Sequence, residues 1–429
     1  MPSESLPWRR RLGEFRSRMT LPPASPPDES RSPVRWLVLG GVWLVYLCFG
    51  LTSVALAPIV EPVTRDLALS HSAMGSVLGI WQLVYIVAAI PCGSLLDRLG
   101  PGRAVFLGAL VIAASGALRS LADDYLTLCL GVAVFGIGGP IVSAGAPKIV
   151  SLWFKGRERG LAMGIYITGP ALGAILVLSS TNSVLMPWLA GDWRRVLQCW
   201  AGMALAGALI WLAVCLHPQV RAMDRRTSAA PRPPQREVLA QLLAIPAVRI
   251  LLAMSVGIFM FNHGLNNWLP ELLRVDGMTA QQAGYWATVP TSVGIFGSLL
   301  IPRLATPERR LIILAGLCVS AGLGTILLHA EPGILLLAGL VAQGIARSSL
   351  MTIAMLTLVE TRGVGERHAG TAGGLFFSAA EIGGATGPIA MGALYDVTGS
   401  FHPGLTLLTV ISGLLLLGVI RLRALARRV

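Results

Sequence analysis

The chain has 429 residues, of which 54% are hydrophobic and 13% are charged, and its mean hydropathy is +0.70. Such a small polar fraction cannot cover a water-soluble globule, so lipid must cover most of the surface. The net charge of +13 fits a basic surface that faces anionic lipid, and it requires no nucleic acid as a partner. The composition therefore predicts a protein of the lipid bilayer and excludes a soluble globular one.

Apolar runs of membrane length follow one another along the chain. A helix needs about 20 apolar residues to cross about 30 Å of hydrocarbon, and a lone strand would leave its backbone groups unpaired in lipid. Twelve runs meet this length, at residues 36–59, 73–96, 103–121, 125–152, 160–184, 194–216, 247–272, 281–302, 310–328, 333–358, 369–393 and 403–422. The predicted fold class is an all-α membrane protein with twelve transmembrane helices.

The two halves of the chain resemble each other. Gly93-Ser94-Leu95-Leu96 recurs as Gly297-Ser298-Leu299-Leu300, and each copy ends an apolar run before an arginine-bearing turn. Many secondary transporters are built from parallel repeats of several helices. We therefore expect two pseudo-symmetric six-helix bundles, over residues 36–216 and 247–429.

Two stretches between and beyond these bundles have a different composition. Residues 1–35 are rich in arginine and proline and contain too few apolar residues to fold alone, so they are expected to form a disordered cytoplasmic tail. Residues 217–246 are expected to form a cytoplasmic linker between the bundles.

The basic residues are unevenly distributed. Most of the 34 Lys and Arg residues lie in the N-terminal tail, in alternate loops, in the linker and at the C-terminus. By the positive-inside rule, both termini should be cytoplasmic, in a multi-pass protein of the cytoplasmic (inner) membrane. The residues assigned to the opposite side are Arg65, Arg119, Arg194, Arg195 and Arg274, and Lys148 and Arg347 lie within spans.

Motifs for metal binding and catalysis are missing from the sequence. The six cysteines lie within spans or at their ends without a Cys-x-x-Cys spacing, which is typical of packing. No zinc-protease, nucleophile-elbow or nucleotide-binding motif occurs. We predict neither a metal site, nor a cofactor, nor enzyme activity.

The run from Gly93 to Arg103 resembles the signature loop of the major facilitator superfamily, between the second and third helices. The twelve spans agree with the helix count of that superfamily, and the resemblance covers residues 36–425. It implies transport by alternating access, in which the two bundles rock about a central site. Glycines allow close helix approach, while charged side chains pair with each other and with helix ends. The residues expected to gate access are Gly93, Asp97, Arg98, Gly100 and Arg103.

The fifth span contains Gly169-Pro170-Ala171-Leu172-Gly173, which is similar to a Gly-Pro-x-x-Gly pattern of antiporters in the same superfamily. Proline kinks a helix, and the flanking glycines let two helices slide closely past each other. We expect Gly169 and Pro170 to take part in gating, although packing alone would produce the same pattern. The fourth span departs from many proton-coupled members, because it carries valine where they carry arginine.

Ionisable residues within spans are the sharpest functional signal, because each costs at least about 2.5 to 3.5 kcal/mol to insert and normally faces the protein interior. Arg347 lies near the centre of the tenth span, with Gln343 one turn before it. A fixed bidentate cation at mid-membrane suits a transporter of small anions. Arg347 and Gln343 are therefore candidate substrate ligands. The alternative for Arg347 is a structural ion pair with Glu381 of the eleventh span, and if an anion displaces Glu381 it can carry a proton.

The seventh span carries a polar stripe. Asn262, His263, Asn266 and Asn267 fall on neighbouring positions of one helix face and are expected to line the substrate site, with His263 as a second candidate for proton coupling. The run that follows, Trp268-Leu269-Pro270-Glu271-Leu272-Leu273, resembles the cyanate permease-like members of the superfamily, a group associated with small anions.

Weaker candidates come from the first half. Polar and aromatic side chains at mid-depth can line a site between the bundles, although ordinary packing explains them equally well. These candidates are Tyr46, Gln82, Tyr85 and Tyr166.

Together these patterns predict a secondary active transporter that moves a small, anionic solute across the cytoplasmic membrane, with protons as a potential coupling ion and a monomer as the working unit. Two alternatives stay open. One is a proton-coupled efflux antiporter for drugs and other amphiphiles, and the other is a membrane sensor that does not transport.

Overall fold

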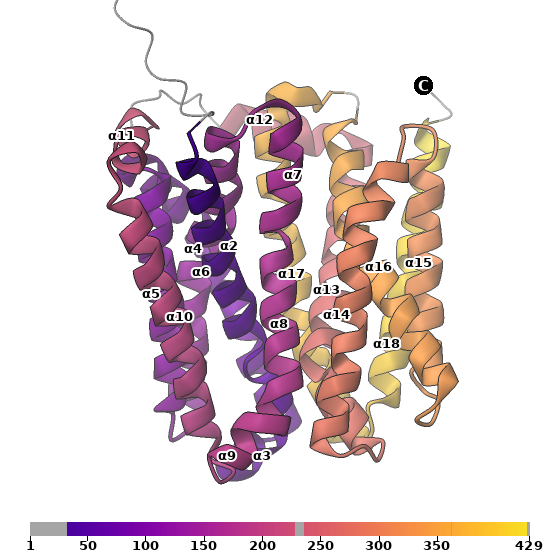
Figure 1. Ribbon diagram of the computed structural model, residues 1–429. Helices are drawn as coiled ribbons and strands as arrows, with labels where there is room; N and C mark the ends of the chain where they lie inside the picture. The colour runs from indigo at the N-terminus through magenta and orange to yellow at the C-terminus, as the bar shows by residue number, and fades with distance from the viewer. Residues whose placement is uncertain (1–31, 228–235, 362, 427–429) are drawn as a thin grey trace, which may run out of the picture.

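The computed structural model describes residues 32–227, 236–361 and 363–426. The predicted disordered tail therefore lies almost entirely outside the described residues. Figure 1 shows two groups of helices side by side, one from α2 to α10 and the other from α13 to α18, which correspond to the two halves of the chain. We call the end at which α2 begins and α18 ends the terminal face, and the opposite end the far face.

Each half contains six long helical segments. In the first half these are α2 (Val34–Val54) with α3 (Val60–Asp66), α4 (His71–Leu99), α5 (Pro101–Ser120), α6 (Tyr125–Trp153), α7 (Gly156–Tyr166) with α8 (Thr168–Ser180), and α10 (Trp193–Cys215). In the second half they are α13 (Pro246–Val275), α14 (Ala280–Leu304), α15 (Arg310–Leu327), α16 (Ile334–Val359), α17 (Gly365–Thr398) and α18 (His402–Ala426). Shorter elements are η2 (Ala57–Ile59), η3 (Thr181–Leu185) and α9 (Met186–Trp188).

The predicted fold class, twelve transmembrane helices in two six-helix bundles, is confirmed. Within the described ranges, eleven segments are long and apolar enough to cross a membrane. The remaining predicted span, the eleventh (residues 369–393), lies in α17, a helix of 34 residues that contains Glu381 and Pro388.

The structure refines the predicted elements in two places. The first and fifth spans are broken helices: α2 ends at Val54 and α7 ends at Tyr166. Both ends lie four residues before a proline, Pro58 or Pro170, and proline has no N–H to bond the carbonyl four residues earlier. In the predicted linker, α11 (Pro218–Thr227) and α12 (Arg236–Ala244) are helical, and residues 228–235 lie outside the described ranges.

Close backbone contacts repeat in the two halves. A Cβ atom added to Gly173 of α8 would lie 2.2 Å from the Leu47 carbonyl oxygen of α2. One added to Gly387 of α17 would lie 2.6 Å from the Met260 carbonyl oxygen of α13. Only glycine fits such approaches. The same packing device thus joins the first and fifth spans of each half, as a duplicated unit predicts.

The halves meet mainly through α4 with α17 and α8 with α14. Toward the far face, the backbones of the two helices in each pair are in direct contact. A Cβ atom added to Gly75 would lie 2.5 Å from the Pro388 carbonyl oxygen, and one added to Gly284 would lie 2.4 Å from the Leu178 carbonyl oxygen. Asn182 also donates a hydrogen bond to the Ala280 carbonyl, at 3.3 Å. The far face is therefore closed.

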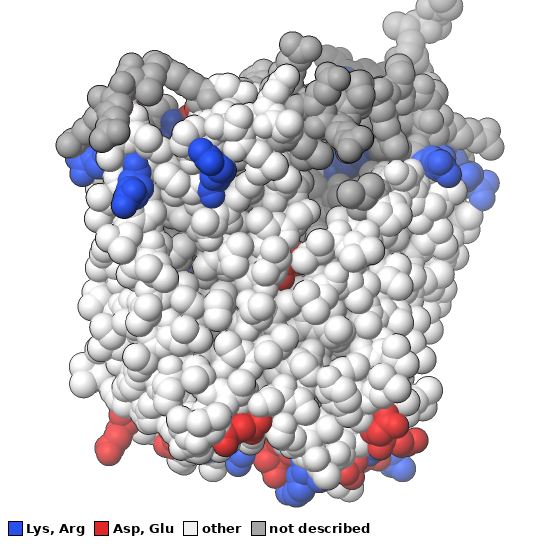
Figure 2. Space-filling model, turned by 180° about the vertical axis from the view of Figure 1, so that it is seen from behind, with Lys and Arg blue, Asp and Glu red and all other residues white. Residues whose placement is uncertain are grey.

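Charge is distributed along the molecule as membrane insertion requires. Figure 2 shows Lys and Arg near both ends and Asp and Glu mostly at the far face, with a broad, largely uncharged belt between the ends. Acidic atoms interrupt this belt only within a groove near mid-height on the side that is shown. The belt matches the apolar segments that span the bilayer.

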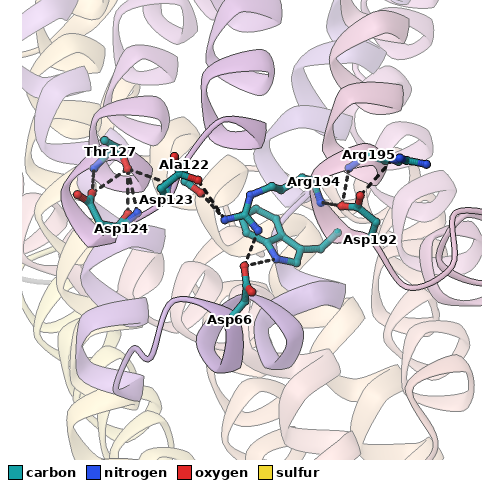
Figure 3. Close-up of polar contacts among 9 residues, drawn as sticks. Asp66, Ala122, Asp123, Asp124, Thr127, Asp192, Arg194 and Arg195 are labelled. Atoms are coloured by element: carbon teal, nitrogen blue, oxygen red, sulfur yellow. Dashed lines mark hydrogen bonds and ion pairs between the residues drawn. The ribbon is translucent and has the colours of Figure 1, made fainter.

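A polar network fixes the far-face ends of the first half (Figure 3). Arg194, at the start of α10, forms an ion pair with Asp66 and donates a hydrogen bond to the Ala122 carbonyl at 2.8 Å. Asp192 caps α10 by accepting from the N–H groups of Arg194 and Arg195. These contacts join α3, α10 and the loop between α5 and α6, so the first half is held together at this end.

Candidate functional site

Arg347 lies on α16 and points toward α13 and α14. Its guanidinium donates hydrogen bonds to Oδ1 of Asn266 and, at 3.1 Å, to Oγ1 of Thr291. Both partners are neutral, and within the described residues no carboxylate forms an ion pair with Arg347. The side chain is partly exposed although it lies deep among the helices. It is therefore a positioned cation whose charge the protein does not neutralise.

Glu381 does not pair with Arg347, so the structural ion pair that the sequence left open is not formed. Glu381 lies on α17, is 4% exposed, and its Oε2 atom has no hydrogen-bond partner. Gln82 and His263 lie close to this carboxyl. All three side chains surround Gly384, where an added Cβ atom would lie 2.9 Å from Glu381 Oε2, 3.1 Å from Gln82 Cγ and 3.4 Å from His263 Cδ2. Glu381 thus faces the first half, whereas Arg347 is held by α13 and α14.

The polar stripe on α13 divides into two parts. Asn262, His263 and Asn266 are partly exposed, and Oδ1 of Asn262 has no partner. His263 Nδ1 lies 3.3 Å from Nε2 of Gln82, which links the halves. Asn267 is only 4% exposed because its amide turns back and donates to the His263 carbonyl at 2.9 Å. Asn267 therefore does not share the surface formed by the other three.

Gln343 was expected to bind the substrate beside Arg347, but its position in the structure differs from that expectation. It is fully buried, and neither its amide nitrogen nor its amide oxygen has a partner. Its backbone packs against Gly324 of α15, where an added Cβ would lie 3.0 Å from the Gln343 nitrogen. Its side chain therefore forms no hydrogen bond with Arg347.

The candidates of the first half belong to a group of aromatic residues. The rings of Tyr46 and Tyr166 are 5.4 Å apart, and the Tyr85 hydroxyl lies 2.8 Å from Oγ of Ser143. Tyr46 and Tyr85 are partly exposed, whereas Gln82 is fully buried and its Oε1 atom has no partner. Sequence reasoning thus located residues near the boundary between the halves, but it did not distinguish exposed from buried ones.

The halves are separated toward the terminal face. A groove of about 810 Å³ separates α7 and α8 from α14, and its lining includes Gly164, Thr168 and Leu299. The halves are in contact at the far face and separated along this groove. The structure is therefore a state in which the boundary between the halves is open toward the terminal face.

The signature loop is bound to its own half. Gly100 has φ of +84°, the left-handed conformation that favours glycine, and forms the turn between α4 and α5. The carboxylate of Asp224, on α11, accepts hydrogen bonds from the N–H groups of Gly102 at 2.8 Å and Arg103 at 3.1 Å. Asp224 was not among the expected residues, because a charge in a linker ordinarily indicates solvent.

The other expected gating residues are placed as follows. Arg98 and Arg103 have exposed side chains, and the Asp97 side chain lies outside the described part of the chain. A Cβ atom added to Gly93 would meet nothing within 4 Å. One added to Gly169 would lie 2.9 Å from the Trp43 carbonyl oxygen, so the Gly169-Pro170 segment packs α8 on α2 of the same half.

Arg119, assigned from the sequence to the side opposite the termini, is a buried charge. It lies in the last turn of α5 and is 2% exposed. Its guanidinium donates to the Thr52 carbonyl at 2.8 Å and lies over the Phe135 ring, 5.5 Å from its centroid. An arginine near the end of an apolar run is normally solvated, so the sequence contained no signal for this burial.

Two bundles of membrane-length helices, closed at one end and open at the other around a buried polar centre, define a secondary transporter. No group of three His, Cys, Asp or Glu side chains in the described ranges is arranged to hold a metal ion. The chain belongs to the Major Facilitator Superfamily, whose sequence profile matches residues 42–388. It is thus a multi-pass membrane transporter and not an enzyme.

Relatives and solved structures agree with this assignment. The chain is 27% identical to the uncharacterized transporter YycB of Bacillus subtilis strain 168, over 89% of this chain and 92% of the relative. It is 24% identical to the probable galactarate/D-glucarate transporter GudP of Escherichia coli strain K12, over 88% and 94% of the two chains. The crystal structure of a mutant of the nucleoside transporter NupG has the same fold, with a TM-score of 0.76 at 14% identity over 90% and 99% of the chains. The cyanate permease-like branch is not singled out.

Proposed function

We propose that this protein moves a small anionic solute across the cytoplasmic membrane by alternating access, with Arg347 as the substrate-binding cation. The observation that carries the proposal is that Arg347 is held by the neutral acceptors Asn266 and Thr291 and is partly exposed. A cation that lies deep among membrane helices without a protein counter-ion costs free energy. A substrate carboxylate supplies the missing charge, and the fork of guanidinium N–H groups binds it in two places.

The relatives support an anionic substrate. GudP is named as a probable transporter of galactarate and D-glucarate, both of which are carboxylates. We extend this to the present chain as a class of solute and not as a particular compound. The polar side chains of α13, Asn262 and Asn266, lie on the same helix face as His263 and can complete the coordination of the anion.

The proposed orientation places the terminal face in the cytoplasm, because the charged side chains seen there are mainly Lys and Arg, whereas the far face carries acidic residues as well. The described conformation is then open to the cytoplasm. A proton is the proposed coupling ion, since the Glu381 carboxyl is buried without a partner for Oε2 and lies beside Gln82 and His263. One chain contains both bundles, so we propose that the monomer is the working unit.

The test is uptake into proteoliposomes by wild type, Arg347→Lys and Arg347→Ala. Lysine keeps the charge but loses the bidentate geometry. We expect Arg347→Lys to reduce uptake of the transported anion at least about tenfold. The control is Arg423→Lys, which makes the same arginine-to-lysine change at an exposed site in the last turn of α18 and should leave uptake unchanged. Unchanged uptake in Arg347→Lys would contradict the proposal.

A second candidate function is efflux of amphiphiles. The groove that separates α7 and α8 from α14 is lined by Leu161 and Leu299, and Leu161 is exposed, which suits an apolar solute. Under this alternative, cationic or neutral amphiphiles would stabilise wild type and Arg347→Ala equally in a thermal-shift measurement. Stabilisation by an anion that disappears in Arg347→Ala favours the first function.

A further inference from the structure

A continuous row of aromatic rings crosses the boundary between the halves. Each ring centroid lies within 6.3 Å of the next, and the rings come from six helices. In order they are Tyr166, Tyr46, Phe49, Phe135, Trp81, His263, Phe259 and Phe377. The Trp81 and His263 rings, 5.7 Å apart, join α4 of the first half to α13 of the second. Tyr46, Phe49, His263 and Phe377 are partly exposed, so the row is not solely core.

The two halves therefore offer different chemistry at the proposed site. The second half supplies the cation Arg347 and the amide of Asn266 that holds it. The first half contributes rings, and two of its nearby hydroxyl and indole groups are already paired within that half. Tyr85 is bonded to Ser143, and Trp43 Nε1 donates to Oγ1 of Thr168 at 3.0 Å.

The buried polar groups near His263 that have no partner are acceptors and not cations. The unpartnered acceptors near His263 are Oδ1 of Asn262, Oε1 of Gln82 and Oε2 of Glu381. A second cation beside Arg347 is not found on the described parts of α4, α13, α16 and α17 at this level. A second carboxylate would therefore be buried without compensation, which is strongly unfavourable.

We infer that the substrate is an aromatic monocarboxylate, a class that differs from the hydroxylated dicarboxylates for which GudP is named. This inference rests on the proposed function of Arg347. The carboxylate binds Arg347, and the ring lies against the row at His263 and Trp81. His263 is three residues before Asn266, about 5 Å along the helix, a distance that a ring joined directly to a carboxylate spans. One hydroxyl on the ring satisfies one of the unpartnered acceptors.

A polyhydroxylated acid fits this site poorly. Each hydroxyl that leaves water without a hydrogen-bond partner is unfavourable, whereas burial of a ring face against other rings is favourable. The wall formed by Phe49 and Phe135 offers no such partners, and Trp81 adds a single indole N–H.

The experiment measures binding of benzoate, 4-hydroxybenzoate, galactonate and galactarate to the purified full chain by thermal shift at constant ionic strength. We expect benzoate and 4-hydroxybenzoate to bind at least about tenfold more tightly than either sugar acid. Trp81→Leu should weaken benzoate binding several-fold, while Trp81→Phe, which keeps a ring, should retain most of it. Phe296→Leu, at a 68% exposed position of α14 outside the row, is the matched control and should change nothing.

Trp81 is 7% exposed, so Trp81→Leu is checked for folding by size-exclusion chromatography. If it does not fold, Phe49→Leu at a partly exposed position of the row replaces it, with the same expectation. Tighter binding of galactonate or galactarate, dependent on Arg347 and insensitive to loss of the ring, would overturn the aromatic class and leave the proposed function intact. Absence of any Arg347-dependent anion binding would overturn both.

Discussion

The carboxylate of Asp396 caps a helix that begins at His71 in the other half of the molecule. It accepts hydrogen bonds from the N–H groups of His71 at 3.0 Å and Ser72 at 2.7 Å, and a further one from the Ser72 hydroxyl. The first N–H groups of a helix have no partner within the helix, and a negative charge there is favourable. The cap joins the end of α17 to the start of α4. It therefore stabilises only the conformation in which the far face is closed.

Asp396→Ala should therefore shift the protein toward a conformation open at the far face. Loss of a helix cap costs about 1 kcal/mol, which corresponds to about a fivefold change in the closed-to-open ratio. The measurement is the distance distribution between spin labels at Asp123 and Glu331, which lie in far-face loops of opposite halves. A larger population at long distance is expected in the variant.

Asp192→Ala is the control, because Asp192 caps α10 through the N–H groups of Arg194 and Arg195 within one half. It removes a cap of the same chemistry and should leave the distance distribution as in wild type. An equal shift in both variants would show that the change reflects general loss of stability and not a contact between the halves.

The sequence was sufficient for the helices but not for the contacts between them. Apolar length located the spans, and Pro58 and Pro170 mark both helix breaks, because a missing N–H acts locally. The cap by Asp396 depends on a residue more than 300 positions away, and nothing near Asp396 indicates it. Similarly, residues 263 and 267 share a helix face, yet Asn267 turns to its own backbone. Side-chain direction is decided by local competition for hydrogen bonds, which periodicity does not describe.

The N-terminus of α6 should show a pH-dependent stability. Hydrogen bonds from Thr127 hold the pKa of Asp124 below its ordinary value of 3.8. Because folding lowers this pKa, the stabilisation is present above the ordinary value and is lost as the pH falls through the folded value. The difference in Tm between wild type and Asp124→Ala should therefore be constant from pH 7 to pH 5 and shrink below about pH 4. A difference that stays the same down to pH 3 would contradict this.

Arg119 should be replaceable by an apolar residue of similar size. Its guanidinium is buried with Nε and Nη2 unpartnered, and its hydrogen bond is to the Thr52 carbonyl. Replacement of an incompletely paired buried charge by a packed apolar side chain is often neutral or stabilising by about 1 to 4 kcal/mol. We expect Arg119→Met to match or exceed the Tm of wild type, and Arg119→Ala to lower it through the cavity it creates. A large loss of Tm in Arg119→Met would show that the charge itself is needed.

Glu381→Gln tests the coupling of transport to protons. The carboxyl is 4% exposed and its Oε2 atom has no hydrogen-bond partner, which makes it the proposed proton carrier. Glutamine has nearly the same shape and binds no proton in this range. In proteoliposomes, Glu381→Gln should retain exchange of substrate across the membrane within about twofold and lose accumulation driven by a pH gradient by about tenfold or more. Glu360→Gln, which removes an acidic residue paired with Arg310 at the terminal face, should retain both activities. Full proton-driven accumulation in Glu381→Gln would exclude this carboxyl as the carrier and make His263, the titratable residue beside it, the next group to replace.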